Sequence, residues 1–175
     1  MKKEDFVNAV AKTIHNGKCE LFIGSGLSLD SKLPKWEELL SPLAKEIGIK
    51  IKKDDDLPCI AQYVLNSNSG NNNIIRAKLM ENFDKEYEIN NSHRYLSNMS
   101  VKTVWTTNYD NLIEKAFSSR KYHVISRDDD FGKPRINNQE IEIIKIHGCI
   151  KSDLKEIVLT QQDYDEIEFK KPVII

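Results

Sequence analysis

Polar side chains follow three short apolar runs of this sequence. The runs and the residues after them are Leu21–Ile23 before Gly24–Ser28, Val101–Trp105 before Thr106–Asp110, and Ile143–Ile146 before His147 and Gly148. In a parallel α/β sheet, such junctions lie at the carboxyl edge of the strands, where ligands bind. A glycine-rich loop, an Asn/Asp pair and a histidine gathered at one edge predict an enzyme that cleaves a nucleotide.

The first junction, Gly24-Ser25-Gly26, has the composition of a phosphate-binding loop. Glycine lets the backbone approach a pyrophosphate, and free N–H groups at a turn or helix start bind its charge. Ser25 and Ser28 add hydroxyl donors. The third glycine of the dinucleotide fingerprint is replaced by Leu29, so an ordinary tight turn after a strand is the alternative interpretation.

The second and third junctions also have structural alternatives. Asn108 and Asp110 are common helix N-cap and first-turn residues, although capping does not account for Thr106 and Thr107 beside them. His147 could be a hydrogen-bonded histidine at the end of a strand. Unlike the other three histidines it directly precedes a glycine at a strand end, and an imidazole titrating near neutrality is a natural general base for a hydroxyl or water.

Metal and cysteine chemistry are not indicated. Cys19, Cys59 and Cys149 are scattered singly, so neither a zinc site nor a disulfide framework is predicted. Cys149 follows His147-Gly148 closely, which leaves a nucleophilic role open beside simple packing as a small apolar residue. Residues Asp128–Pro134 are predicted to form a solvated turn. A metal at the acidic triplet Asp128–Asp130 is the alternative, which is not favoured because adjacent carboxylates point in different directions.

Composition narrows the class of protein. The chain has 175 residues, of which 39% are hydrophobic and 30% charged, as expected for a globular domain with a real core. Its 27 acidic and 26 basic residues give a net charge of −1, so nucleic acid is not an expected partner. No stretch is long and apolar enough to predict a membrane span or a secretory signal, and we expect a cytoplasmic protein.

Helical and strand patterns alternate along the chain. Apolar spacing predicts helices near residues 6–16, 36–47, 57–65, 75–83, 93–99 and 109–117, and strands at 19–23, 101–105, 122–125, 141–146 and 156–159. Asp56 is the expected N-cap of the third helix, with Pro58 in its first turn, and Gly48 ends the second. The fold class is therefore α/β, with a Rossmann-like parallel sheet flanked by helices.

The three junctions together resemble the signature blocks of the sirtuin (SIR2) superfamily, in the same order. They are Gly24-Ser25-Gly26-Leu27-Ser28, Thr106-Thr107-Asn108-Tyr109-Asp110 and Ile146-His147-Gly148. Leu33–Leu39 and Val158–Tyr164 resemble the bacterial SIR2-like branch, which includes NAD-hydrolysing effectors of anti-phage defence such as the Thoeris type. The similarity spans about Lys18 to Phe169.

This resemblance implies a role for each block. Gly24, Ser25, Gly26 and Ser28 would hold the NAD pyrophosphate and nearby ribose, and Thr107 belongs to the same binding set. Asn108 would orient the nicotinamide ribose and the attacking group, Asp110 would hydrogen-bond the carboxamide, and His147 would act as the base.

Protein-deacylating sirtuins carry a four-cysteine zinc module that this chain lacks. Pro34-Lys35-Trp36-Glu37 replaces their Pro-Asp-Phe-Arg element, and Thr107 replaces a common glutamine. These departures favour NAD⁺ hydrolysis without zinc over lysine deacylation.

The sequence-based hypothesis is a single SIR2-like NAD-binding domain over residues 1–175, with the C-terminal part of the fold missing after Ile175. It would release nicotinamide and a linear or cyclic ADP-ribose product. Its role would be that of a defence effector triggered by a partner domain or protein. The oligomeric state is left open, and a homo-oligomer is one alternative. A non-catalytic module that senses NAD or ADP-ribose is the first alternative. An interaction domain with a vestigial site is the second.

Overall fold

The computed structural model describes residues 2–71, 73–83, 85–130, 141–150 and 156–172. Its centre is a sheet of four parallel strands in the order β1-β2-β4-β3. The strands are β1 (Leu21–Ile23), β2 (Thr103–Thr106), β3 (Tyr122–Ile125) and β4 (Ile141–Lys145). The α/β class and the parallel sheet predicted from the sequence are thus confirmed.

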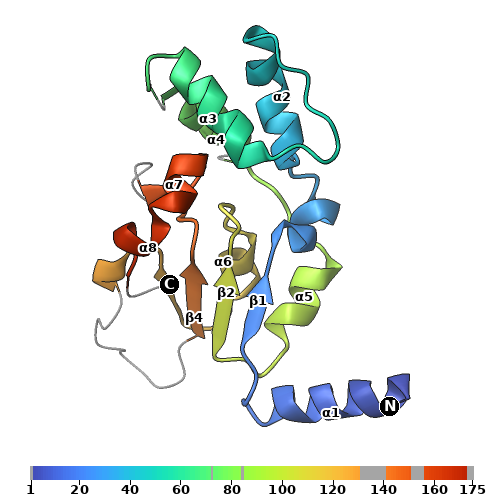
Figure 1. Ribbon diagram of the computed structural model, residues 1–175. Coiled ribbons are helices and arrows are strands. Elements are labelled where there is room, and N and C mark those ends of the chain that lie inside the picture. The colour runs from blue at the N-terminus through green and yellow to red at the C-terminus, as the bar shows by residue number, and fades with distance from the viewer. Residues whose placement is uncertain (1, 72, 84, 131–140, 151–155, 173–175) are drawn as a thin grey trace.

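Helices surround this sheet (Figure 1). They are α1 (Lys3–His15), α2 (Trp36–Glu46), α3 (Leu57–Ser67), α4 (Asn73–Phe83), α5 (Asn91–Ser97), α6 (Leu112–Ala116), α7 (Gln161–Asp165) and α8 (Ile167–Lys170), with 3₁₀ turns η1 (Ser25–Ser31) and η2 (Asp128–Asp130). Helices α2, α3 and α4 form a layer beyond the carboxyl ends of the strands, whereas α1 lies beyond their amino ends (Figure 1). The strand polarity therefore directs the three polar junctions toward the α2–α4 layer.

Local sequence signals set the ends of α2 and α3 as expected. The Asp56 carboxylate accepts a hydrogen bond from the Cys59 N–H at 3.2 Å, and Pro58 lies in the first turn of α3. Gly48 follows α2 with a φ of +78°, which is the left-handed conformation that glycine adopts at helix ends. These signals fix where α2 stops and where α3 starts.

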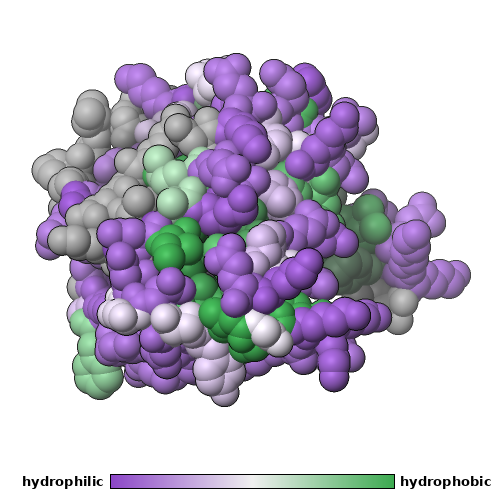
Figure 2. Space-filling view, turned by 90° about the horizontal axis from the view of Figure 1, so that it is seen from above, coloured by the Kyte–Doolittle hydropathy of each residue, from purple (hydrophilic) through white to green (hydrophobic). Residues whose placement is uncertain are grey.

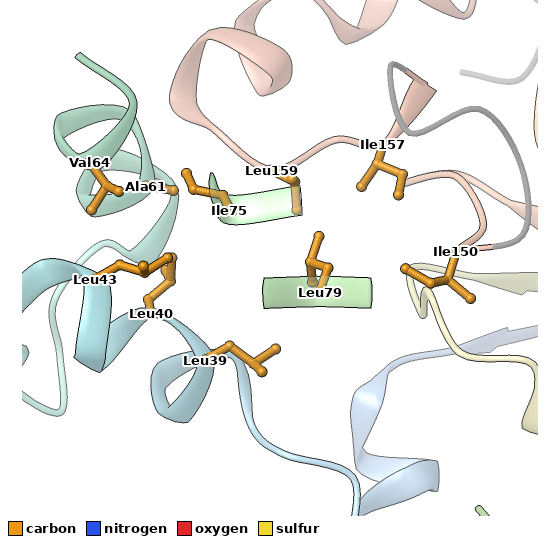
Figure 3. Close-up of a cluster of buried hydrophobic side chains, with 10 residues drawn as sticks. All are labelled: Leu39, Leu40, Leu43, Ala61, Val64, Ile75, Leu79, Ile150, Ile157 and Leu159. Atoms are coloured by element: carbon orange, nitrogen blue, oxygen red, sulfur yellow. The ribbon is translucent and has the colours of Figure 1, made fainter. Parts of the chain in front are cut away.

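Two apolar cores hold the sheet and the helical layer. In the first, α5 and α6 pack on one face of the sheet, with Leu96, Phe117, Val104 and Ile143 buried between them. The second joins α2, α3 and α4 to the segments that follow β4, and Figure 3 shows its side chains pointing toward one another. The layer is thus anchored to the carboxyl edge of the sheet.

The prediction of a fifth strand at Glu156–Leu159 is wrong. Residues 157–159 are buried but belong to no strand, because Ile157 and Leu159 pack into the α2–α4 core rather than beside the sheet. Their backbone donors bind elsewhere: the Val158 N–H donates to the His147 carbonyl at 3.1 Å, and the Leu159 N–H to Asp163 Oδ2 at 3.1 Å. An apolar run of this length has no feature that separates a strand from a buried extended segment.

The face seen from the side of the helical layer is mostly hydrophilic, with a few apolar groups near its middle (Figure 2). Among the described helices, none combines the length and apolar character needed to cross a membrane.

Candidate functional site

A cavity of about 510 Å³ lies between the carboxyl edge of the sheet and the α2–α4 layer. Seven of the eight site residues predicted from the sequence line it, namely Ser25, Gly26, Ser28, Thr107, Asn108, Asp110 and His147. The eighth, Gly24, does not line the cavity and instead precedes the η1 turn in extended conformation. These seven residues, which lie up to 122 positions apart in the sequence, therefore line one cavity.

The loop after β1 leaves room beside its glycines. A Cβ atom added to Gly24 or Gly26 would meet no other atom within 4 Å, and neither residue has a positive φ. Packing within the chain therefore does not require glycine at either position. At Gly26, which lines the cavity, the open space leaves the backbone accessible to a bound molecule.

A buried hydrogen-bond network joins this loop to the turn after β2. Ser28 Oγ donates to Asp110 Oδ2 at 3.0 Å and accepts a hydrogen bond from Asn108 Nδ2 at 3.3 Å. Asp110 Oδ1 accepts from the Leu112 N–H at 3.0 Å, although Asn111 and not Asp110 is the N-cap of α6, so the expected capping role is wrong. Asn108 Oδ1 is buried without a partner among the described residues, and it can accept a hydrogen bond from a ligand hydroxyl.

Replacing Ser28 by Ala is expected to lower the free energy of unfolding by about 1–3 kcal/mol. The change removes one partner from a buried carboxylate and one from a buried amide, both of which lose solvation without compensation. Urea unfolding monitored by circular dichroism measures the effect. Ser25→Ala is the matched control, because Ser25 lines the same cavity but is exposed. Equal stability of the two variants would contradict the structural importance of the network.

A buried ion pair between β4 and α6 stabilises the turn after β2. Lys145 of β4 is fully buried, and its Nζ donates to Glu114 Oε1 of α6 at 2.8 Å and to the main-chain carbonyl of Asp110. Burial disfavours the ammonium, but Glu114 and the other nearby acidic groups outweigh it and raise the pKa of Lys145. Sequence reasoning missed this pair. A lysine within the apolar run of β4 was the available signal, since a buried charge needs a partner.

His147 lies at the end of β4 with a mostly buried imidazole. Burial, and then the positive charge of Lys171, lower the pKa of His147 from 6.5 to about 4. Its ring makes no hydrogen bond to the described residues and contacts Tyr164 edge-on, with ring centroids 5.1 Å apart. At neutral pH the imidazole is therefore uncharged and able to accept a proton.

The stability of the fold is expected to rise with pH between about 4 and 6.5. In this window the unfolded chain binds a proton at His147 that the folded chain does not, so protonation favours unfolding. His147→Gln should remove roughly 1–3 kcal/mol of this dependence, a range reduced for partial exposure of the ring. Urea unfolding at pH 4.5 and 7 measures it. His15→Gln, at an exposed histidine, is the control, and an unchanged slope in His147→Gln would contradict the assignment.

A row of aromatic rings forms one wall of the cavity, and the sequence analysis assigned no role to it. Tyr109 lies 6.1 Å from Trp36, 6.2 Å from Phe83 and 6.3 Å from His147, measured between ring centroids. Its hydroxyl donates to the Val158 carbonyl at 2.6 Å, and burial raises the Tyr109 pKa well above the usual range. The position of Tyr109 between Asn108 and Asp110 was the signal that could have identified it.

Other candidate groups lie apart from this cavity. Cys149 is buried and does not line it. Asp128–Asp130 forms the η2 turn, and the expected continuation of this turn through 131–134 lies outside the described residues. Within the described ranges, no three histidine, cysteine or acidic residues are grouped so that they could hold a metal ion.

Comparison with known proteins adds to this geometry. Residues 102–174 match the family model of the SIR2-like domain. The chain is 36% identical over 170 residues to an NAD(+) hydrolase ThsA of Enterococcus faecium and 31% identical over 173 residues to one of Bacillus cereus. These matches cover 96% and 95% of the chain and 35% of each relative. It is also 28% identical to Defense-associated sirtuin 2 of Bacillus subtilis, with 96% of the chain and 17% of that protein aligned.

The chain thus spans about a third of the length of the ThsA proteins it matches. The alignments with these proteins include all three polar junctions, since they cover nearly all of the chain, and the family model includes the second and third. The sequence and the fold agree with this relationship. The chain is a SIR2-like domain related to the ThsA NAD(+) hydrolases and to a defense-associated sirtuin.

Proposed function

We propose that this domain hydrolyses NAD⁺ to nicotinamide and ADP-ribose. The observation that carries the proposal is the pairing of Asn108 and His147 in one cavity. Asn108 presents a buried carbonyl oxygen that lacks a partner among the described residues, and His147 presents an uncharged imidazole. A domain that only binds a nucleotide needs the loop after β1 but has little use for a base.

In the proposed reaction the bond between the ribose C1′ and the nicotinamide nitrogen breaks. Its electron pair leaves with nicotinamide, which departs neutral, and a water oxygen forms the new bond to C1′. The water loses a proton to His147, while Asn108 Oδ1 accepts a hydrogen bond from a ribose hydroxyl and orients the sugar. Electrostatic preorganisation, and exclusion of bulk water once NAD⁺ is bound, would supply most of the rate.

The remaining predicted residues have binding roles in this proposal. Ser25 and Gly26 approach the pyrophosphate, and Thr107 extends the binding surface after β2. Ser28 and Asp110 are hydrogen-bonded to each other. Asp110 would therefore bind the nicotinamide carboxamide through a carboxylate that also binds the loop after β1. NAD⁺ is the substrate, and no zinc is invoked. The names of the relatives, NAD(+) hydrolase and defense-associated sirtuin, support a role in defence. Action against phage, location in the cytoplasm and activation by an additional domain or protein stay predictions from the sequence.

Incubation of the purified protein with NAD⁺, with nicotinamide release followed by chromatography, tests this function. Release that is lost in Asn108→Ala supports the hydrolase. Stabilisation of the fold by NAD⁺ without release would favour the sensing alternative. The absence of both nicotinamide release and stabilisation by NAD⁺ would contradict an NAD site and would favour the interaction domain.

A further inference from the structure

Two adjacent lysines after α7 have opposite environments. Lys170 has a side chain that is 42% exposed and forms ion pairs with Asp163 and Glu166 at 3.1 and 3.0 Å. Lys171 is only 1% exposed, although it directly follows the short helix α8. Lysine is almost never fully buried unless its ammonium has partners, so the second environment requires an explanation.

The partners of Lys171 lie at the carboxyl edge of the sheet. Its Nζ donates to the Ile146 carbonyl at 2.9 Å and to the Ser126 carbonyl at 3.1 Å. Ile146 directly precedes His147, and Ser126 directly follows β3. The ammonium therefore joins the ends of β3 and β4 just beyond their last registered pair, Ile125 and Ile144.

We propose that Lys171 is a positioning residue for His147, which holds the peptide bond leading into that histidine and places a buried positive charge beside its imidazole. Lys171 Nζ, itself anchored on the Ser126 carbonyl, donates to the Ile146 carbonyl, and the Val158 N–H donates to the carbonyl of His147. The carbonyl groups of Ile146 and His147 therefore both accept hydrogen bonds, which restrain the main chain on each side of the histidine. This restricts the directions in which the imidazole can point into the cavity.

The charge of Lys171 acts on the protonation of His147. A nearby positive charge disfavours the imidazolium, and the lysine adds to the effect of burial in lowering the His147 pKa. The other titratable groups packed against the imidazole are the phenols of Tyr109 and Tyr164, and Lys35, Glu37 and Asp110 line the same cavity. Burial lowers the pKa of Lys171 itself, while Glu156 and Asp128 act in the opposite direction.

The consequence for turnover rests on the proposed NAD⁺ hydrolysis, whereas the effect on His147 does not. If His147 accepts the proton of water, a neighbouring ammonium keeps it uncharged and available at mildly acidic pH. The test must therefore read His147 directly in the protein without NAD⁺.

Imidazole ¹⁵N chemical shifts distinguish neutral histidine from imidazolium, and we expect Lys171→Met to change them. At pH 5, above the His147 pKa of about 4, roughly one tenth of the parent histidine is protonated. In Lys171→Met the protonated fraction at pH 5 should rise, because the charge is gone while burial remains. Lys170→Met is the matched control and should leave it unchanged.

Two further variants, one that keeps the charge and one that removes it, test the same effect if Lys171→Met does not fold. Lys171→Arg should keep the parent protonation, and Lys171→Gln, whose amide can still donate to a carbonyl, should raise it. A folded Lys171→Met or Lys171→Gln with the parent's protonated fraction would overturn the proposal. In a protein that releases nicotinamide, the acidic limb of kcat against pH should move to higher pH in Lys171→Met and Lys171→Gln, but not in Lys171→Arg or Lys170→Met. If the parent protein releases no nicotinamide, the proposed NAD⁺ hydrolysis is contradicted, and the NMR comparison still decides whether Lys171 acts on His147.

Discussion

Replacing His147 by Ala is expected to slow nicotinamide release from NAD⁺ by roughly 10²–10⁴-fold. The imidazole is the neutral base that the described residues of the cavity present, because burial and Lys171 hold its pKa near 4. Without it the attacking water must lose its proton to solvent. Progress curves of nicotinamide release at pH 7 measure the change in rate.

The His147→Ala result needs two controls. His15→Ala, at an exposed histidine of α1, should retain the parent rate. NAD⁺ should still raise the melting temperature of His147→Ala, since the proposed contacts to the pyrophosphate come from the loop after β1. A variant that keeps most of the parent rate would show that His147 is not the base.

Replacing Gly148 by Ala is expected to cost roughly 3 kcal/mol or more in the free energy of unfolding. Gly148 has a φ of +86°, and an added Cβ would lie 2.8 Å from the Glu156 carbonyl oxygen and 3.2 Å from the Ile157 Cα. Both obstacles are backbone atoms, which cannot rotate away as a side chain would. The segment at 156–159 must therefore shift, and its contacts with His147 and Tyr109 shift with it.

Gly48→Ala separates the two causes of this loss. Gly48 also has a positive φ, of +78°, but an added Cβ there meets nothing within 4 Å. This variant should lose only about 1 kcal/mol, from backbone strain alone. Chemical unfolding of both variants measures the difference. Similar losses at the two positions would mean that residues 156–159 yield easily and do not constrain the histidine.

Local sequence patterns predicted most elements because each has a local physical cause. The strand Tyr122–Ile125 has the predicted bounds, and Asp56, Pro58 and Gly48 mark helix ends as expected. The helix expected at 109–117 is shorter and begins at Leu112. Asp110 lies before the N-cap Asn111, and its carboxylate accepts hydrogen bonds from the Leu112 N–H and from Ser28. The polar turn was foreseeable, but the partner of Asp110, 82 residues away, was not.

The carboxyl-edge rule explains why the candidate site could be predicted before any coordinates. In a parallel sheet the carboxyl ends of all strands lie at one edge, so the three polar junctions must share that edge. They also share one cavity because β1, β2 and β4 are neighbours in the sheet. Asn108 and His147 line one cavity for this reason. The aromatic wall was not foreseen, because Trp36, Phe83 and Tyr164 come from separate helices whose packing the sequence does not state.

The amino-acid sequence by itself determined the α/β class, the alternation of elements and the types of group at the strand ends, since periodicity and capping act over a few residues. Tertiary structure alone decided that β4 lies between β2 and β3, and that Glu156–Leu159 packs under the helical layer instead of joining the sheet. It also decided that Lys145 and Lys171 are buried near the site. These outcomes depend on long-range packing and on the need of a buried charge for distant partners, and neither is encoded in local spacing.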